Sequence, residues 1–197
     1  MVKAKIAVLV SGGGTNLQAL IDAEKSGIIV SGEIMLVISN NENAYALTRA
    51  KNNNIATAYI PSKAPDFETQ LIKILKDNDI DIIILAGFMK ILSGDFTKTF
   101  ENRIINVHPS LIPSFCGKGF YGLKVHEEAL KYGVKVTGAT VHFVNEIPDG
   151  GNIILQKAVY IEEGDTPEIL QKRVMEQAEW KILPQAAELL SQKYIKE

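Results

Sequence analysis

The chain has 197 residues, of which 46% are hydrophobic and 22% charged, and its formal net charge is −2 with a pI near 6.0. This length and composition exclude a disordered or fibrous chain and predict a single globular domain, residues 1–197, with room for a full parallel sheet. The small net charge excludes a long-range field that would gather nucleic acid or an anionic membrane surface, so small molecules are the expected partners.

The first half of the chain alternates short β-branched runs with amphipathic segments, which is typical of βαβ units and a parallel sheet. Strands are predicted at Lys5–Val10, Glu33–Ile38, Ala56–Ile60 and Ile80–Leu85, and helices at Asn16–Lys25, Ala44–Asn53 and Asp66–Asp77. The apolar run of the last strand is the kind expected for a central strand that is buried on both faces.

The pattern changes in the second half of the chain. A helix at Ser93–Phe100 and a strand at Ile104–Val107 precede a long loop, Ser110–Gly122, whose glycine, proline and aromatic content indicates a function. Two longer strands, at Val134–Phe143 and Ile153–Tyr160, flank a turn and are expected to pair antiparallel.

The last helix is predicted to begin at Thr166-Pro167-Glu168, where a capping hydroxyl, a proline and an acid stand in the order found at helix starts. It is expected to run to about Ser191, which leaves residues 192–197 as a candidate flexible tail. The whole chain is therefore predicted to be one α/β domain with a mostly parallel sheet and an antiparallel strand towards its C-terminal end.

Cysteine content and the N-terminus indicate a cytoplasmic protein. Cys116 has no second cysteine with which to form an internal disulfide, and Met1-Val2-Lys3 leads into strand-like sequence without a signal-peptide pattern. The longest apolar runs fall far short of the roughly 20 residues that a membrane-spanning helix needs. No membrane partner is expected, and the chain is expected to act as a monomer or a homodimer.

A glycine-rich segment, Ser11-Gly12-Gly13-Gly14-Thr15-Asn16, joins the first predicted strand to the first helix. At the carboxyl end of a strand, free backbone N–H groups and the helix dipole attract an anion. The segment lacks the Gly-Lys-Ser/Thr of a Walker loop and has Leu17 in place of the third glycine of a dinucleotide fingerprint, so one phosphate is favoured over a pyrophosphate. A tight turn without a ligand is the alternative, and the position directly before a helix favours the phosphate.

Asn106 and His108 stand at the end of a predicted strand. Alternation along a strand places both side chains on the same side, where an amide and an imidazole can converge on one reacting atom. The pair suits acyl transfer, because a protonated His108 can donate to the oxygen that becomes negative in a tetrahedral intermediate, and Asn106 can donate to the same oxygen or to the attacking amine. Pro109 would keep the backbone of His108 extended. A histidine at a strand end is more often structural, so the hypothesis needs a third group.

Asp149, in the turn Ile147-Pro148-Asp149-Gly150-Gly151, is the candidate third group. An acid on a glycine-rich turn is by itself most simply a turn former. If the turn folds over the carboxyl ends of the strands, however, Asp149 approaches His108, raises the pKa of its imidazole and relays the proton of an attacking amine. We therefore predict that Asp149 and His108 lie close together.

Other chemistries fit the residues less well. His126-Glu127-Glu128-Ala129-Leu130 has a leucine where a zincin needs its second histidine, so no metal site is expected. Cys116 has no CxxC neighbour, and the chain has no Gly-x-Ser-x-Gly elbow of a serine hydrolase. His142 lies in an apolar strand and is most simply a core or rim residue.

Four motifs follow one another in a specific order and spacing. They are Ser11-Gly12-Gly13-Gly14-Thr15-Asn16-Leu17-Gln18, Leu85-Ala86-Gly87-Phe88-Met89-Lys90-Ile91-Leu92, Asn106-Val107-His108-Pro109-Ser110-Leu111-Ile112-Pro113, and residues 138–144 leading to Asp149-Gly150-Gly151. Together they resemble the phosphoribosylglycinamide formyltransferase family, from Lys5 to about Pro184. The resemblance implies a three-layer Rossmann-like formyltransferase fold and direct transfer of the formyl group of 10-formyltetrahydrofolate to the amine of glycinamide ribonucleotide in purine synthesis.

The resemblance also implies roles for particular residues. The catalytic set would be Asn106, His108 and Asp149. The residues that would bind the ribonucleotide are Gly13, Gly14, Thr15 and Asn16 at its phosphate, Glu179 at its ribose, and Gly87 and Pro109. The residues that would line the folate pocket are Leu85, Met89, Lys90, Ile91, Leu92, Val141, Phe143 and Val144, with Lys63 near the glutamate tail. Apart from the resemblance, Met89, Ile91 and Leu92 are most simply core residues.

The chain departs from the family pattern at several positions. Lys90 stands where the family often has an arginine, and Lys63 stands near another, so bidentate contacts to the folate tail would become single-point contacts. The loop at Ser114–Gly122 is longer than the corresponding loop of the family. Trp180 replaces a histidine that commonly follows the acid at Glu179.

Four other functions are alternatives. An initiator-tRNA formyltransferase would need a further C-terminal domain and a formyltetrahydrofolate hydrolase a further N-terminal one, and 197 residues at a net charge of −2 are expected to hold neither. A phosphate-binding module without chemistry would not need Asn106, His108 and Asp149 to converge. A dinucleotide reductase is disfavoured by Leu17 and by Ser39-Asn40, which stand where an acid would close the second strand.

Overall fold

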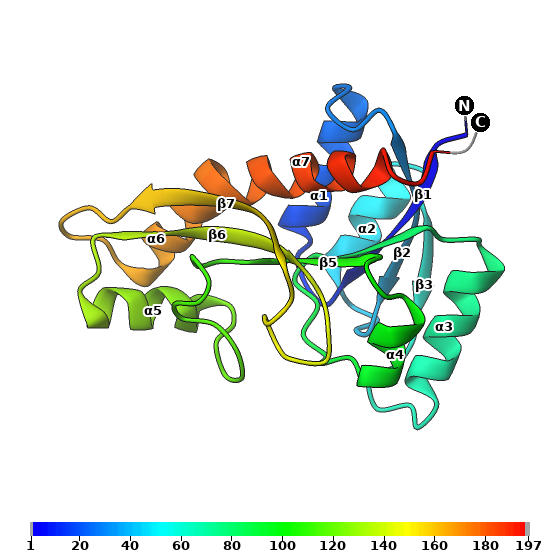
Figure 1. The fold of residues 1–197 in the computed structure, drawn as a ribbon, viewed down its shortest axis with the longest axis horizontal. Helices are drawn as coiled ribbons and strands as arrows, with labels where there is room; N and C mark the ends of the chain where they lie inside the picture. Colours follow the sequence, from blue (N-terminus) through cyan, green and yellow to red (C-terminus); the bar gives the residue numbers. More distant parts are fainter. Residues whose placement is uncertain (1, 196–197) are drawn as a thin grey trace.

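The structure is a computed structural model that describes residues 2–195. It contains a seven-stranded sheet with the strand order β3-β2-β1-β4-β5-β6-β7 (Figure 1). The strands are β1 (Ala4–Val10), β2 (Gly32–Ser39), β3 (Ala56–Tyr59), β4 (Ile82–Leu85), β5 (Ile104–His108), β6 (Val136–Phe143) and β7 (Ile153–Tyr160). The helices are α1 (Thr15–Lys25), α2 (Tyr45–Asn52), α3 (Phe67–Asp77), α4 (Gly94–Thr99), α5 (Leu123–Tyr132), α6 (Pro167–Val174) and α7 (Trp180–Ser191), and a π-helical turn, Met175–Glu179, joins α6 to α7.

The sheet is parallel from β3 to β5 and antiparallel beyond β5. β1 pairs in parallel with β2 and β4, β2 with β3, and β4 with β5. β6 pairs antiparallel with both β5 and β7. The prediction of a mostly parallel sheet with antiparallel pairing towards the C-terminal end is confirmed.

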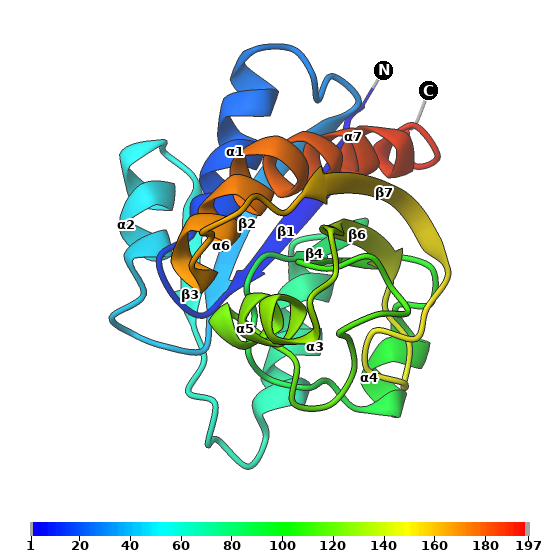
Figure 2. The ribbon, with the colours of Figure 1, turned by 90° about the vertical axis from the view of Figure 1, so that its left-hand side faces the viewer.

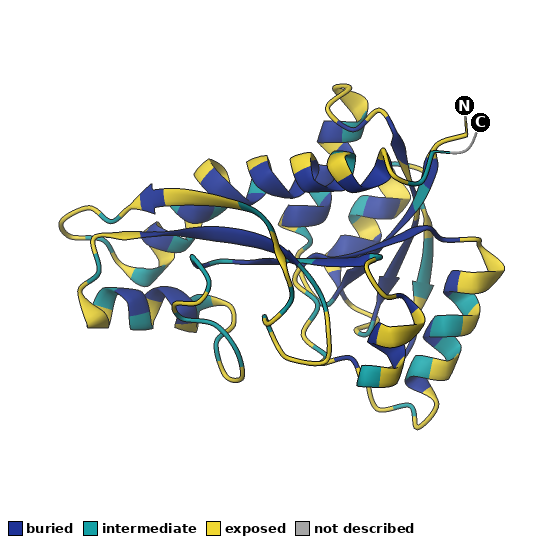
Figure 3. Cartoon of the chain, viewed as in Figure 1, coloured by how far each residue is buried: buried dark blue, intermediate teal, exposed yellow. Residues whose placement is uncertain are grey.

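Helices cover both faces of the sheet (Figure 2). On one face, α1, α2, α6 and α7 share a hydrophobic core with Ile6 and Val8 of β1, and on the other face α3 and α4 share a second core with Ala7 and Leu9. Successive strand side chains point to opposite faces, so β1 is buried on both sides. Together with β5 and β6 it is mostly dark in Figure 3, whereas the edge strands β3 and β7 are largely exposed. The chain therefore has the three layers that the resemblance implies. None of the helices described in residues 2–195 is both long and apolar enough to cross a membrane.

Helix α5 is missing from the elements predicted from the sequence, which has no helix between Gly122 and Val134. A signal for it exists. Val125 and Ala129 are buried at helical spacing, and Gly133 adopts a left-handed conformation directly after the last turn. The pattern is short and includes His126, so it is weak without the tertiary contact, which α6 supplies by packing against α5.

The last predicted helix is present but interrupted. It begins as predicted, because the hydroxyl of Thr166 accepts a hydrogen bond from the N–H of Ile169 at 3.3 Å and Pro167 occupies the first turn. The π-helical turn then separates α6 from α7, a feature often found at functional sites. In the candidate tail, Tyr194 packs against the core, and residues 196–197 lie outside the described part of the chain.

The carboxyl ends of β1 and β4 meet where the strand order reverses. The chain proceeds from β1 to β2 on one side, while β4 lies on the other side. In open α/β sheets, ligands bind in the crevice outside the strands at this point. The loops that follow the two strands touch here, because the N–H of Met89 donates to the hydroxyl of Ser11 at 2.9 Å.

Candidate active site

Two adjoining cavities lie beside the carboxyl ends of the strands. The larger one has a volume of about 640 Å³ and is lined by Asn16 and Glu179 as well as by Asn106, His108 and Asp149. The smaller one has a volume of about 130 Å³. Asn106 and Asp149 border both cavities, so a group held between them can meet ligands from either side.

The structure brings Asp149 to His108, as predicted from the sequence. Asp149 Oδ2 lies 3.5 Å from His108 Nδ1, and both side chains are largely buried. His108 ends β5, and Asp149 lies on the turn between β6 and β7 with a positive φ of 56°. Asn106, also on β5, lines the larger cavity together with His108, which is what strand alternation predicts.

His142 also belongs to this cluster. From the sequence it was expected only as a core or rim residue. β5 and β6 pair so that His142 lies opposite Asn106. Its Nε2 lies 3.2 Å from the amide nitrogen of Asn106 and 3.5 Å from Asp149 Oδ1, while Nδ1 faces the carbonyl oxygen of Phe143 at 2.8 Å. Only the register of two strands shows that His142 joins Asn106 to Asp149.

The long loop after β5 contacts the same cluster from outside. His108 Nε2 lies 2.8 Å from the carbonyl oxygen of Phe115, and the N–H of Gly117 donates to Asp149 Oδ2 at 2.8 Å. A carbonyl oxygen is only an acceptor, so Nε2 of His108 carries a proton in this arrangement. The proton that titrates is therefore the one on Nδ1, the nitrogen that faces Asp149.

Burial lowers the pKa of His108 below its ordinary value, and the charge of His142 lowers it further. The carboxylate of Asp149 and the carbonyl of Phe115 act in the opposite direction, but burial outweighs them. Asp149 therefore acts on the pKa of His108 in the predicted direction, and burial, which the sequence does not show, reverses the net shift. His108 is therefore mainly neutral at neutral pH, and the neutral ring can still donate through Nε2.

Asp149 is an anion at neutral pH. Burial alone would raise the pKa of its carboxyl group, but the hydrogen bond with His142, the charge of His108 and the N–H of Gly117 together lower it below its ordinary value. A carboxylate held between two imidazoles stabilises whichever ring takes up a proton. The cluster can thus hold an amide donor, an imidazole donor and a proton acceptor around one reacting atom.

The glycine-rich segment forms the loop between β1 and α1, as predicted. Gly14 caps α1 in the left-handed conformation with φ 73°. Asn16, in the first turn of α1, donates to Glu179 Oε2 at 2.7 Å, so the last part of the chain meets the loop at this point. The side-chain oxygen of Asn16 is buried and has no hydrogen-bond partner within residues 2–195. An unpaired buried acceptor beside a cavity is suited to receive a hydrogen bond from a ligand.

Glu179, which accepts the hydrogen bond of Asn16, also lines the larger cavity. Burial raises the pKa of its carboxyl group to about 7, although the hydrogen bond from Asn16 acts to lower it. Near neutral pH the group is partly protonated, so it can donate as well as accept a hydrogen bond. Such a group suits a ligand hydroxyl.

Only some of the residues that the resemblance places around the folate border the two cavities. Those that border one or both cavities are Leu85, Met89, Lys90, Ile91, Leu92 and Val144. Val141 is fully buried in the core, Phe143 borders a separate groove near α4, and Lys63 is exposed outside the linings of the two cavities. Lys90 donates to the carbonyl of Ser62 at 2.7 Å and lies over the ring of Phe67. Of the remaining predicted contacts, Gly87 and Pro109 line the larger cavity.

His126 of α5 also lines the larger cavity, and the sequence analysis considers it only as a metal ligand. Its side chain is fully buried and neither ring nitrogen has a partner within residues 2–195. Burial and the charge of His108 lower its pKa to about 4, so the ring is neutral at neutral pH. Across the described residues, no group of three or more His, Cys, Asp or Glu side chains is arranged to hold a metal ion.

Comparison with known sequences relates the chain to a family of enzymes. The model of the formyl transferase family matches residues 4–187. Phosphoribosylglycinamide formyltransferase of Haemophilus influenzae is 44% identical over 184 residues, which cover 91% of this chain and 84% of that protein. The trifunctional purine biosynthetic protein adenosine-3 of Gallus gallus is 44% identical over 193 residues, and this chain spans only 18% of its length.

Solved structures show the same relationship. Glycinamide ribonucleotide transformylase 1 from Symbiobacterium toebii superposes with a TM-score of 0.89 at 39% identity, covering 97% of this chain and 89% of that one. Phosphoribosylglycinamide formyltransferase from Anaplasma phagocytophilum gives a TM-score of 0.88 at 39% identity, covering 99% and 90%. The similarity therefore extends over the whole fold, including every element that carries the cavity residues.

Proposed function

The chain belongs to the formyl transferase family, and we propose that it transfers the formyl group of 10-formyltetrahydrofolate to the amine of glycinamide ribonucleotide, with Asn106, His108 and Asp149 as its catalytic residues. The observation that carries the proposal is the composition of the larger cavity. Its lining includes Asn16 of the first turn of α1 and Glu179, which suit a ribose phosphate, and His108 and Asp149, which suit proton transfer. Phosphoribosylglycinamide formyltransferases with this fold support the substrate assignment.

The proposed reaction is a direct transfer. The amine nitrogen of the ribonucleotide attacks the formyl carbon, a new C–N bond forms, and the formyl oxygen becomes negative in a tetrahedral intermediate. Asn106 and His108 donate hydrogen bonds to this oxygen, and Asp149 assists removal of the amine proton. The bond to N10 of the folate then breaks, and N10 takes up a proton. No covalent bond to the protein is needed.

Both ring nitrogens of His108 have partners in the structure, so the formyl oxygen must replace one of them. Nδ1 faces Asp149, whose charge stabilises the protonated ring, while Nε2 faces the carbonyl of Phe115. We expect the oxygen to replace the Phe115 carbonyl, because the new acceptor bears a developing charge and forms the stronger hydrogen bond.

The smaller cavity is the proposed site for the folate ring system. Leu85, Leu92 and Val144 supply apolar lining, and the turn that carries Asp149 closes one side. A flat heterocycle in this cavity has its linker directed towards Asn106 and Asp149, which border both cavities. Lys90 and the more distant Lys63 are the proposed contacts for the glutamate tail.

The experiment that tests the function follows release of tetrahydrofolate from 10-formyltetrahydrofolate with and without glycinamide ribonucleotide. Release that requires the ribonucleotide, together with formation of its formyl derivative, is the expected result. Release without the ribonucleotide would show a hydrolase. No release, with the ribonucleotide still bound, would show that this chain accepts another formyl donor or acts only in binding.

A further inference from the structure

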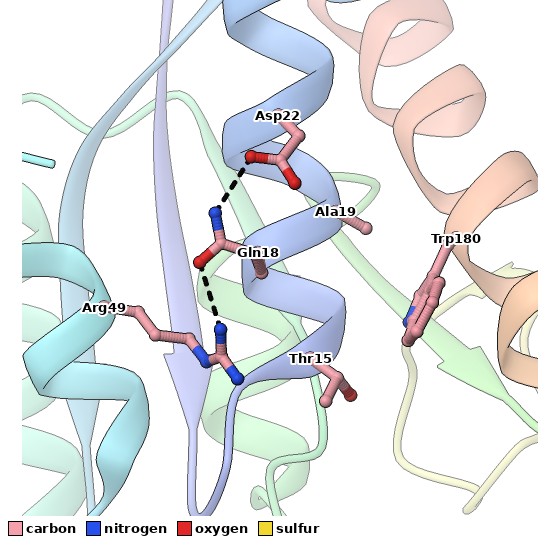
Figure 4. Close-up of a pocket in the computed structure, with 6 residues that line it drawn as sticks. All are labelled: Thr15, Gln18, Ala19, Asp22, Arg49 and Trp180. Carbon is pink, nitrogen blue, oxygen red and sulfur yellow. Dashed lines mark hydrogen bonds between the residues drawn. The ribbon is translucent and has the colours of Figure 1, made fainter. Parts of the chain in front are cut away.

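The glycine-rich loop after β1 has no cationic side chain of its own, since residues 11–16 are Ser-Gly-Gly-Gly-Thr-Asn. Arg49 on α2 reaches it from outside (Figure 4). Its Nε donates to the carbonyl oxygen of Gly13 at 2.8 Å, and its Nη1 donates to Gln18 Oε1 at 3.2 Å. Within residues 2–195, no other Lys or Arg side chain has a recorded hydrogen bond to this loop. The one cation bound to the loop therefore comes from a different helix.

The contacts with α2 determine which way the loop peptides point. The carbonyl of Gly12 accepts from the N–H of Ala46 at 3.1 Å, and the carbonyl of Gly13 accepts from Arg49. In a trans peptide the C=O and the following N–H point in opposite directions. The N–H groups of Gly13 and Gly14 consequently point away from α2. Helix α2 approaches closely enough that a Cβ on Gly14 would lie 2.6 Å from the Cβ of Ala46.

No carboxylate neutralises the charge of Arg49 directly. Its two hydrogen bonds go to uncharged oxygens, and none of the ion pairs found in residues 2–195 includes it. Asp22 is connected to it only through Gln18, which donates to Asp22 at 2.9 Å. The ring of Tyr45 lies 5.0 Å from the guanidinium carbon and supports it from one side. A positive charge thus remains behind N–H groups at the start of a helix, where it adds to the attraction of the helix dipole for an anion.

We propose that Arg49 is a positioning residue for the phosphate of the substrate. It holds the peptide between Gly13 and Gly14 so that the N–H of Gly14 faces the phosphate, and it gives the loop its positive charge without touching the ligand. The inference rests on the proposed function, which brings a sugar phosphate to this loop. It assigns to Arg49 the preference for a phosphorylated acceptor, and leaves binding of the folate and the chemical step to other residues.

The test compares the wild type with Arg49→Gln, Arg49→Lys and Lys51→Gln. Lys51 is exposed on the same helix, so Lys51→Gln is a matched loss of charge away from the loop. We expect Arg49→Gln to weaken binding of ribose 5-phosphate by about tenfold or more, because the N–H of Gly14, no longer held in place, loses its hydrogen bond to the charged phosphate. Arg49→Lys retains the charge but loses the planar fork, so its loss should be intermediate. Calorimetric titration measures these affinities without any transfer of formyl.

The same variants are then assayed for formyl transfer. The expected result for Arg49→Gln is a raised KM for the ribonucleotide, with the KM for the folate and kcat close to those of the wild type and of Lys51→Gln. Equal affinity of wild type and Arg49→Gln for ribose 5-phosphate overturns the inference, and so does an equal loss of affinity for the folate, which would show a general structural role. A wild type that does not bind ribose 5-phosphate overturns it as well. If the affinity for ribose 5-phosphate falls from the wild type to Arg49→Lys to Arg49→Gln but no formyl group is transferred, the proposed function fails and the role of Arg49 stands.

Discussion

Asp149 lies between two imidazoles, with Oδ2 3.5 Å from His108 Nδ1 and Oδ1 3.5 Å from His142 Nε2. The contact with His108 is expected from the sequence, because a turn that folds over the carboxyl ends of the strands brings Asp149 to the end of β5. The contact with His142 depends on the register of β6 against β5, which the pattern of residues does not specify. The state of the Asp149 carboxylate therefore depends on both His108 and His142, and only the contact with His108 was expected from the sequence.

Replacing Asp149 by Asn tests the role of the carboxylate. The variant keeps the shape of the side chain and loses the charge that assists removal of the amine proton, so we expect kcat to fall by about a hundredfold or more with little change in KM. Steady-state kinetics with both substrates measures the effect. Glu163→Gln, which removes an exposed acid from a distant loop, is the control and should leave kcat unchanged. A kcat for Asp149→Asn near that of the control would contradict the assignment.

Replacing His142 by Gln tests a positioning role. Contact with His142 helps to lower the pKa of Asp149, so its loss should raise that pKa and move the acidic limb of the pH profile of kcat to higher pH. The loss of kcat at neutral pH should be smaller than that of Asp149→Asn, because Asp149 is still ionised there. The pH dependence of kcat for the wild type and for His142→Gln measures this shift. An acidic limb at the wild-type position would show that His142 only fills space.

At the scale of elements, the turn between β6 and β7 determines where Asp149 lies. This turn is closely packed against the end of β6, because a Cβ on Gly151 would lie 1.8 Å from the carbonyl oxygen of Phe143. That contact involves backbone, which cannot rotate away as a flexible side chain does. The sequence shows the glycines of the turn, but the close approach of Phe143 that requires one of them is visible only in the folded chain.

Replacing Gly151 by Ala should therefore displace the turn. We expect the free energy of unfolding to fall by about 2 kcal/mol, which is a typical cost of overpacking. The ratio kcat/KM should fall as well, since Asp149 moves away from His108. Chemical denaturation and steady-state kinetics measure the two effects. Gly94→Ala is a suitable control, because its Cβ would meet only the flexible side chain of Glu146, whose carboxylate would lie 3.3 Å away. Similar results for the two variants would show that the turn tolerates a side chain.

At the scale of the whole molecule, burial of His126 makes stability depend on pH. Its pKa is about 4 in the folded chain and 6.5 in its ordinary state, so the unfolded chain binds more protons between these values. The contribution of the neutral His126 ring to the free energy of unfolding is fully present above pH 6.5, and it is lost as the pH falls towards 4. The full difference corresponds to about 3 kcal/mol.

The measurement that tests this is the free energy of unfolding of the wild type and of His126→Gln between pH 4 and pH 7.5. Glutamine does not titrate in this range, so the wild type should lose more stability than the variant as the pH falls. The difference between the two proteins removes the contribution of the carboxylates, which titrate in both. A difference that is constant with pH would show that His126 is not buried as a neutral ring.

Most of the fold could be predicted from local patterns. Alternation and helical spacing predicted all seven strands and every helix except α5, and the order of short strands and helices predicted a parallel sheet. Helix α5 was missed because Val125 and Ala129 give too short an apolar pattern without its contact with α6. The interruption of the last helix was missed for a similar reason, since no residue type marks a π-helical turn.

The sequence by itself determined the glycine-rich loop before α1, the shared orientation of Asn106 and His108 along β5, and the hydroxyl cap of α6. Each depends on residues that are close neighbours in the chain, where backbone geometry and a fixed repeat leave few alternatives. Only the tertiary structure decided that His142 joins Asn106 to Asp149, that Glu179 receives a hydrogen bond from Asn16, and that Arg49 holds the loop. These pairs come from distant segments, and their contacts depend on strand order, strand register and helix packing, which a local repeat does not encode.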